Sequence, residues 1–184
     1  YFRLLPARDG AVPMIVMDAP PPMEDCRPFV HAAQVLRAAG VNVPEVHDAD
    51  LGQGFLLLDD FGAMTFLDCL DADRGAAATL YRDATEALVR MQVASRPGVF
   101  PDYDRALLDR ELSLFPDWYL GRHRGATLTD GQRGILRTSF DLLLDNNLAQ
   151  PRVFVHRDYH TRNLMRLDGP RNPGVLDFQD AVYG

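Results

Sequence analysis

The pattern of apolar and polar positions predicts a small β-rich part at the start of the chain. Two short segments rich in aromatic and branched residues flank Asp9-Gly10, which predicts a β-hairpin. A helix capped by Asp25 and running to about Ala39 is expected, because apolar residues recur there at helical spacing and Gly40 follows as a stop signal. The extended segments expected in this part are 1–5, 12–17, 41–46 and 54–58.

After the acidic pair Asp59-Asp60 the periodicity becomes helical. Apolar residues at three- and four-residue spacings predict helices, and Thr129 or Asp130 is expected to cap the last of them. The expected helices cover 65–70, 74–95, 105–122 and 130–148, and short strands are expected at 152–155, 164–167 and 174–176. This order predicts the α+β class, with a β-rich first part and a larger, mostly helical second part.

Composition and charge exclude several classes of partner. The 19 basic residues, all of them Arg, face 26 acidic ones, and the formal net charge is −7. Nucleic acids and anionic membranes require a basic face, so neither is expected as a partner. No apolar run reaches the roughly 20 residues of a membrane span, and no signal peptide is visible. We expect a cytoplasmic protein with reduced cysteines and no obligate protein partner.

The most informative segment lies between two short apolar strands late in the chain. Asp158 and Asn163 have the spacing D-x-x-x-x-N, and Asp177 ends another apolar strand fourteen residues later. Phosphoryl transfer from ATP requires a carboxylate beside the attacking hydroxyl and oxygen ligands for Mg²⁺. Asp158 fits the first role, and Asn163 and Asp177 fit the second. A polar loop capped by its own side chains is the alternative, but the flanking strands favour the catalytic interpretation.

The segments HRDYHTRNLM and GVLDFQDAVYG resemble the aminoglycoside phosphotransferase and choline kinase superfamily, which has the protein-kinase fold. With YFRL, VMDAPP, EDCRPFV and AGVNVPEV, the likeness runs from the first residue to the last. It is greatest to the anomeric sugar kinases of bacterial cell-wall recycling, which phosphorylate N-acetylmuramate and N-acetylglucosamine at the C1 hydroxyl. The resemblance implies ATP and Mg²⁺ as cofactors and a sugar as acceptor. It makes Asp158 the catalytic base, and Asn163 and Asp177 the metal ligands.

The resemblance also implies a bilobal kinase-like fold. Residues 1–58 would form a β-rich N-lobe, 59–63 a hinge, and 64–184 a mostly helical C-lobe. Both ends of the chain look cut, so the N-lobe is expected to be incomplete and the C-lobe truncated. The glycine loop that covers the nucleotide would precede Tyr1. Gln179 stands where protein kinases have the Gly of Asp-Phe-Gly, which argues against a regulated protein kinase.

On the nucleotide side, the resemblance implies that 56–61 lie beside the adenine. Leu57, Asp59 and Phe61 are the expected contact residues, and the side chains of Asp59 and Asp60 are expected in solvent. The superfamily usually has a Lys on the third strand, but this chain has no Lys. Arg3 on the neighbouring strand is the candidate substitute, because a guanidinium fork suits phosphate. An exposed strand residue without such a role is an equally good interpretation of Arg3.

Four further residues are candidates for the acceptor side. His160 and Arg162 lie in the catalytic loop, where Arg162 suits a phosphoryl group or a substrate carboxylate. Glu111 and Trp118 fall on one face of a predicted helix, where an aromatic ring would pack against a sugar. A core-facing stripe is the alternative for this face. His156 is expected to brace the loop from behind rather than to transfer protons.

Two competing functions stay open. The first keeps the fold and changes the acceptor to an aminoglycoside, choline or another small alcohol. The second is a non-catalytic nucleotide-binding module, which the missing Lys favours and the intact acid set opposes.

Overall fold

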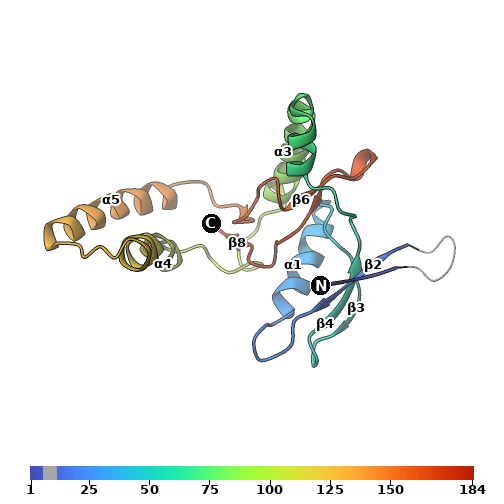
Figure 1. Ribbon diagram of the computed structural model, residues 1–184, viewed down its shortest axis with the longest axis horizontal. Coiled ribbons are helices and arrows are strands. Elements are labelled where there is room, and N and C mark those ends of the chain that lie inside the picture. The colour runs from blue at the N-terminus through green and yellow to red at the C-terminus, as the bar shows by residue number, and fades with distance from the viewer. Residues whose placement is uncertain (6–11) are drawn as a thin grey trace. The chain divides into compact units, whose positions relative to one another are not determined.

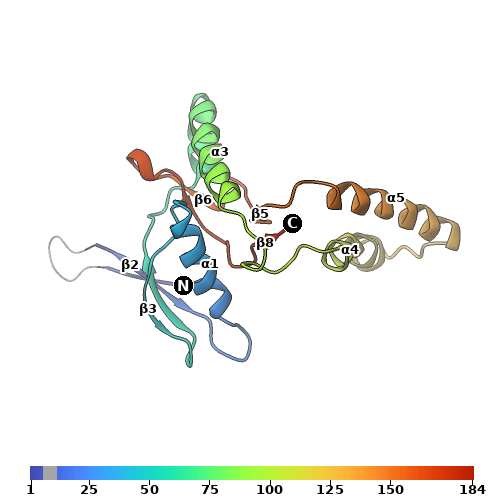
Figure 2. The same ribbon diagram turned by 180° about the vertical axis from the view of Figure 1, so that it is seen from behind.

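The computed structural model describes residues 1–5 and 12–184 (Figures 1 and 2). Contacts divide the chain into two compact units, one of residues 1–95 and 154–181 and the other of 96–153 and 182–184. These units differ from the lobes expected from the sequence, because residues 96–153 make most of their contacts among themselves and form a unit apart from 1–95 and 154–181. The division into an N-lobe, hinge and C-lobe stays a prediction. Within the described residues, no helix is both long and apolar enough to cross a membrane.

A four-stranded antiparallel sheet begins the first unit. Its strands are β1 (Phe2–Leu4), β2 (Met14–Asp18), β3 (Val46–Asp50) and β4 (Phe55–Asp59), in the order β1-β2-β4-β3. The pairing of β1 with β2 confirms the expected hairpin strands, whereas the expected turn at Asp9-Gly10 lies outside the described residues. Of the extended segment expected at 41–46, only the last residue lies in a strand, because β3 starts at Val46. Pro44 cannot donate a ladder hydrogen bond, so a strand is unfavourable at that residue. Strand β3 is an exposed edge strand with a polar sequence, and it therefore lacks the apolar pattern by which strands are predicted.

Helix α1 (Arg27–Ala38) lies beside this sheet (Figures 1 and 2). Its buried residues are the predicted ones: Phe29, Ala32, Ala33 and Leu36. The expected cap at Asp25 is early by one residue, because Cys26 takes the cap position; the Asp25 carboxylate still accepts a hydrogen bond from the Arg27 N–H at 3.0 Å. Burial raises the pKa of the Cys26 thiol, whose Sγ donates to the Gly54 carbonyl at 3.7 Å. Cys26 and Cys69 are both free thiols, as expected.

The rest of the first unit consists of helices and short strands. Thr65 caps α2 (Phe66–Ala72) in a capping box with Asp68, and hydrogen bonds from Thr65 hold the pKa of the Asp68 carboxyl below its usual value. The short helix η1 (Arg74–Ala76) leads into α3 (Ala77–Val93). The strands β5 (Phe154–Val155), β6 (Leu164–Met165) and β7 (Gly174–Val175) are shorter than expected, and η3 (Gly169–Arg171) lies between the last two. Strands β6 and β7 pair antiparallel beside the site described below.

The second unit is a helical hairpin with one short strand. Helix α4 (Arg105–Leu114) continues into the π-helix η2 (Phe115–His123), and α5 (Asp130–Leu148) follows. The single α-helix expected at 105–122 therefore changes type at Phe115, where Pro116 removes a backbone donor from the α pattern. Thr129 caps α5, as one of the two expected alternatives. Arg105 and Arg137 join α4 to α5 through Asp109, Asp141 and Asp145, and β8 (Val182–Tyr183) completes the unit.

Candidate active site

The loop between β5 and β6 carries Asp158 and Asn163, and its own backbone closes it. The His160 N–H donates to the Asp158 carbonyl at 3.0 Å, and the Asn163 N–H donates to the His160 carbonyl at 2.9 Å. The loop is tied to the start of α2, since the Leu67 N–H donates to the Thr161 carbonyl at 3.1 Å. Two successive turns thus hold Asp158 at the surface with an exposed side chain.

His156 supports the loop from the protein interior, as expected. Its side chain is 2% exposed, and Nε2 donates to the Leu176 carbonyl at 3.0 Å. The Tyr159 ring meets the imidazole edge-on at 5.5 Å between centroids, and the Tyr159 hydroxyl donates to the Ala84 carbonyl at 2.7 Å. Burial raises the pKa of Tyr159, which keeps this hydroxyl protonated. His156 therefore joins the loop to the strand segment that leads to Asp177.

The burial of His156 makes stability depend on pH. Desolvation lowers its pKa from the usual 6.5, although the charges of Asp177 and Asp158 act in the opposite direction. Below pH 6.5 the unfolded chain binds a proton that the folded chain resists, so the free energy of unfolding should fall with falling pH. We expect His156→Phe to be less stable at about pH 7.5 but to lose part of this dependence between about pH 7.5 and 5.5, measured by urea unfolding.

The exposed His123 provides the matched control for this experiment. His123→Gln should retain the pH dependence of the wild type. An equal dependence in His156→Phe and the wild type would contradict the assignment of the effect to His156.

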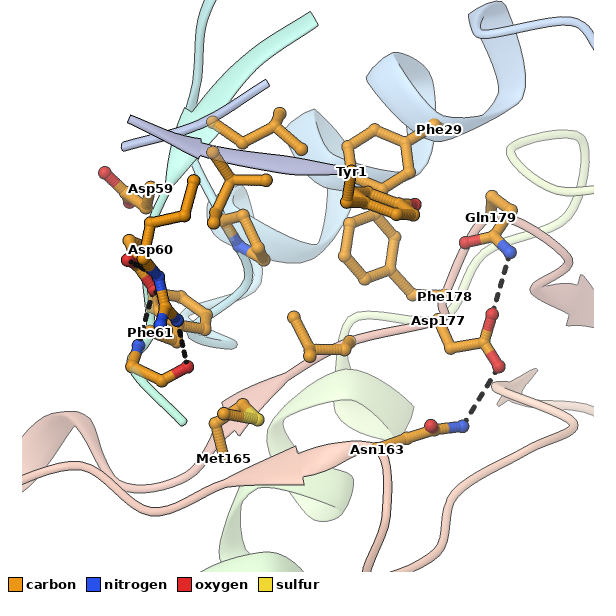
Figure 3. A pocket seen from close by; sticks show the side chains of 16 residues that line it. Tyr1, Phe29, Asp59, Asp60, Phe61, Asn163, Met165, Asp177, Phe178 and Gln179 are labelled. Atoms are coloured by element: carbon orange, nitrogen blue, oxygen red, sulfur yellow. Dashed lines mark hydrogen bonds and ion pairs between the residues drawn. The ribbon is translucent and has the colours of Figure 1, made fainter. Parts of the chain in front are cut away.

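Asn163 and Asp177 meet directly. The Asn163 Nδ2 donates to Asp177 Oδ2 at 3.0 Å, and Gln179 Nε2 donates to Asp177 Oδ1 at 2.9 Å (Figure 3). The Asn163 Nδ2 also donates to the Asp158 carbonyl at 3.0 Å. The backbone supports this contact, since the Leu176 N–H donates to the Asn163 carbonyl at 2.9 Å. The fold therefore brings together the two predicted metal ligands and the backbone of the predicted base.

Two residues of this region have backbone conformations that are rare for a residue with a Cβ. Arg157 has a φ of 74° and Asp177 a φ of 62°. Arg157 follows His156, and Asp177 follows Leu176. His156 and Leu176 are joined by a hydrogen bond, and the Leu176 N–H also donates to the Asn163 carbonyl. Such left-handed residues persist where their surroundings fix them, and they cluster at functional sites.

The donor set at Asn163 and Asp177 fits a hard cation shared with a ligand. Mg²⁺ prefers oxygen ligands, retains several waters, and commonly takes only one or two protein ligands beside phosphate oxygens. Within the described residues no group of three or more His, Cys, Asp or Glu side chains is placed to hold a metal. One carboxylate and one amide thus suit an ion that arrives with a nucleotide.

A cavity of about 360 Å³ extends from this pair (Figure 3). Its middle is apolar, and the rings of Phe29 and Phe178 pack there with centroids 4.8 Å apart. Asp59, Asp60 and Phe61 lie at one end, and Asn163, Asp177 and Gln179 lie at the other. An apolar slot with polar groups at its ends suits a flat base with a charged tail.

Phe61 approaches the backbone of β7 closely. A Cβ built on Gly174 would come nearer than 3.0 Å to two atoms of the Phe61 ring, a contact that real Cβ atoms essentially never make. The lack of a side chain at Gly174 therefore lets this ring line the cavity.

The predicted nucleotide contacts are placed as follows. Asp59 and Phe61 line the cavity, but Leu57 is not among the described lining residues, and Leu58 is. Successive side chains of a strand point to opposite faces, so only one of the two leucines can face the cavity. Arg3 also lines the cavity, but its guanidinium is bound to Asp60.

The expectation that Asp60 lies in solvent is wrong. Its side chain is 3% exposed, and its carboxylate accepts hydrogen bonds from Arg3 and from the Gly62 N–H. The Arg3–Asp60 pair is not visible in the sequence, because the two residues are far apart in the chain and only the pairing of the strands brings them together. The Asp59 carboxylate, in contrast, is partly exposed and has as partners His47 Nε2 at 2.8 Å and the Glu45 N–H at 3.0 Å.

The predicted acceptor residues divide between the two units. His160 and Arg162 are exposed in the loop that carries Asp158. Glu111 accepts a hydrogen bond from the Tyr103 hydroxyl, and Trp118 is 54% exposed with the Arg122 guanidinium 4.1 Å from its ring centroid. The exposure of Trp118 argues against a buried core stripe. Contact of these residues with an acceptor stays a prediction.

Three curated relatives match the chain along its whole length. It is 52% identical over 184 residues to the N-acetylmuramate/N-acetylglucosamine kinase of Pseudomonas putida and 53% identical to that of Pseudomonas aeruginosa. Each match covers 100% of this chain and 52% of the relative. The enzyme of the same name from Neisseria meningitidis is 43% identical, with 100% of this chain and 54% of the relative covered. The chain thus spans about half the length of these relatives.

Solved structures share the fold at low sequence identity. The gentamicin complex of APH(2")-IIa aligns with a TM-score of 0.61 at 16% identity, covering 93% of this chain and 60% of that one. A choline/ethanolamine kinase family protein from Mesorhizobium loti aligns with a TM-score of 0.54 at 20% identity, covering 83% and 48%. These likenesses confirm the expected kinase-like α+β fold.

The family described as "Phosphotransferase enzyme family" matches residues 1–184, which is the whole sequence. This match and the site geometry agree with the resemblance noted in the sequence. The chain belongs to the phosphotransferase enzyme family.

Proposed function

We propose that the chain forms the catalytic part of a kinase that uses ATP and Mg²⁺ to phosphorylate a sugar hydroxyl. The observation that carries the proposal is the meeting of Asn163 and Asp177, beside the backbone of Asp158, at one end of an apolar cavity. The relatives named N-acetylmuramate/N-acetylglucosamine kinase support a sugar as the acceptor.

In this proposal each group has a separate task. The apolar slot takes the nucleotide base, and the side-chain oxygens of Asn163 and Asp177 would hold the Mg²⁺ that arrives with the nucleotide phosphates. Mg²⁺ bound with the nucleotide neutralises charge on its phosphates. Asp158 orients the acceptor hydroxyl and takes its proton as the new bond to the γ-phosphorus forms, while the bond from that phosphorus to the bridging oxygen breaks and ADP leaves. Most of the acceleration then comes from positioning and charge stabilisation.

We further propose the C1 hydroxyl of N-acetylmuramate or N-acetylglucosamine as the acceptor, as part of cell-wall recycling in the cytoplasm. An anomeric hydroxyl is more acidic than an ordinary alcohol. A carboxylate such as Asp158 is therefore an adequate base for it, since base efficiency follows the difference in acidity. His160 and Arg162 in the same loop are proposed to contact the sugar or the transferred group, and Glu111 and Trp118 are proposed as further sugar contacts.

Two alternatives differ in what they predict. An aminoglycoside or choline kinase would use the same centre on another acceptor, and the solved structures above support only the shared fold. A nucleotide-binding module without catalysis is favoured by the absence of Lys from the chain. The presence of Asp158, the proposed base, in the loop that also carries Asn163 argues against this second alternative, because a module that only binds does not require a base beside the phosphates.

The test is ATP turnover by the full-length protein with a panel of acceptors. We expect N-acetylmuramate or N-acetylglucosamine to stimulate turnover and phosphorus NMR to place the phosphate on C1. The matched control is the C1 methyl glycoside of N-acetylglucosamine, which has no free C1 hydroxyl and should be inert. Phosphorylation of that glycoside would refute the C1 assignment. Turnover with choline or an aminoglycoside but with no sugar would refute the proposal that a sugar is the acceptor. Nucleotide binding without turnover on any acceptor would favour the non-catalytic binding module.

A further inference from the structure

Arg3 on β1 holds the segment 60–62, here called the connector, through a buried carboxylate. The Arg3 Nε lies 2.6 Å from Asp60 Oδ2, and the Arg3 Nη2 donates to Asp60 Oδ1 at 3.0 Å. The same Nη2 donates to the Gly62 carbonyl at 2.9 Å. The Asp60 side chain is 3% exposed, while that of Arg3 is 42% exposed. One guanidinium therefore fixes both ends of the connector.

The connector also closes on itself. The Gly62 N–H donates to Asp60 Oδ1 at 2.8 Å, and Gly62 has a φ of 82°, which a residue with a side chain rarely adopts. Both polar backbone groups of Gly62 are thus occupied, one by Asp60 and one by Arg3. Phe61 lies between Asp60 and Gly62, both of which are held by hydrogen bonds. The residues of this group that line the cavity are Arg3, Asp60, Phe61 and Gly62.

The ion pair lies at the end of the cavity away from the proposed metal ligands. Figure 3 shows Asp60 at the end opposite to Asn163 and Asp177. Since the Arg3 guanidinium is bound to Asp60, it belongs to the same end. Arg3 is also the only Lys or Arg among the described residues that line the cavity. A nucleotide bound with its base in the apolar slot and its phosphates toward Asp177 would present the base, and not the phosphates, to the Arg3–Asp60 pair.

We propose that Arg3 and Asp60 are positioning residues that set the affinity of the site for the nucleotide base. The pair fixes the connector backbone and the ring of Phe61 at the wall of the slot, so the slot is formed before the base enters. Loss of Arg3 leaves a buried carboxylate with only one of its donors, which the connector can relieve only by moving. The inference rests on the proposed function, in which the cavity binds ATP.

This role differs from a phosphate contact in a way that binding can detect. A positioning pair affects the binding of the base, which adenosine and ATP share. Arg3→Met should therefore lower the affinities for adenosine and ATP by the same factor, expected to be about tenfold. A phosphate contact would weaken ATP and leave adenosine unchanged. Turnover adds a second readout, since KM for ATP should rise in Arg3→Met while kcat stays near that of the wild type.

The experiment is calorimetric titration of the full-length protein with adenosine and with Mg·ATP, beside ATP turnover. Arg27→Met is the matched control, because it removes an exposed ion pair with Asp25, at 2.8 Å, that does not line the cavity. Arg3→Lys keeps the charge without the fork and should recover only part of the lost affinity. Asp60→Asn keeps an acceptor oxygen and the turn, and is expected to weaken the binding of both ligands. This variant keeps the test possible if Arg3→Met does not fold.

The outcomes separate this inference from the proposed function. Equal weakening of adenosine and ATP in Arg3→Met or Asp60→Asn, with Arg27→Met unchanged, would support the inference. Loss of ATP affinity alone would overturn the inference and leave the proposed function standing. Unchanged affinities in both variants would overturn the inference as well. A wild-type protein that binds neither ligand would overturn both.

Discussion

Replacing Asp158 by Asn is expected to lower kcat by at least about a hundredfold, the lower end of what a general base contributes. The substitution keeps the size of the side chain and its ability to orient a hydroxyl, but an amide cannot take the proton. The loop should keep its shape, because the hydrogen bonds that close it use the Asp158 carbonyl rather than its side chain. The affinity for Mg·ATP should therefore stay close to that of the wild type.

The measurement is single-turnover transfer to N-acetylglucosamine by the full-length protein, with nucleotide affinity determined in parallel. Asp168→Asn is the matched control, because Asp168 is an exposed acid that ends the segment after β6 and does not line the cavity. Sugar-dependent turnover in Asp158→Asn equal to that of the wild type would refute the proposed mechanism. An equal loss in Asp168→Asn would show that the effect is not specific to Asp158.

Replacing Asp177 by Ala is expected to abolish the part of the ATP affinity that depends on Mg²⁺. The Asp177 carboxylate is the only charged partner of the Asn163 and Gln179 amides among the hydrogen bonds of the described residues. Without it, the cavity end loses the negative charge that would hold a divalent ion. Turnover should fall by at least about a hundredfold, since charge stabilisation at a phosphoryl group is worth several kcal/mol.

The comparison is ATP affinity with Mg²⁺ and with EDTA, in the wild type and in Asp177→Ala. We expect the two conditions to differ in the wild type and to agree in the variant. Adenosine affinity should not change, because the base occupies the other end of the cavity. If Mg²⁺ raises the ATP affinity of Asp177→Ala as much as that of the wild type, the metal assignment is wrong.

Local signals in the sequence were sufficient to predict much of the fold. Helix α1 and its buried face follow from apolar spacing, and the cap at Thr129, one of the two expected alternatives, follows from residue chemistry within one turn. Strand β3 escaped prediction because an edge strand can present polar side chains to solvent and then lacks an apolar pattern. The change of α4 into η2 escaped prediction as well, because periodicity does not distinguish hydrogen-bond spacing.

The candidate site shows the same division. The spacing of Asp158 and Asn163 within one loop was visible in the sequence, and the meeting of Asn163 with Asp177 needed only the pairing of β6 with β7. The binding of Arg3 to Asp60 could not be predicted, because it depends on which neighbour each strand takes in the sheet. The sequence therefore offers Arg3 as a candidate cation for the phosphates, which stays a prediction, whereas its binding to Asp60 and to the Gly62 carbonyl is visible only in the structure.

A crystal structure of the full-length protein with Mg²⁺, a non-hydrolysable ATP analogue and N-acetylglucosamine tests the central claim most directly. The account predicts the adenine in the slot between the connector and Phe178, and the phosphates and Mg²⁺ at Asn163 and Asp177. It also predicts the sugar C1 hydroxyl within hydrogen-bond distance of the Asp158 carboxylate. A nucleotide bound outside this cavity, or an Asp158 carboxylate turned away from a correctly bound sugar, would contradict it.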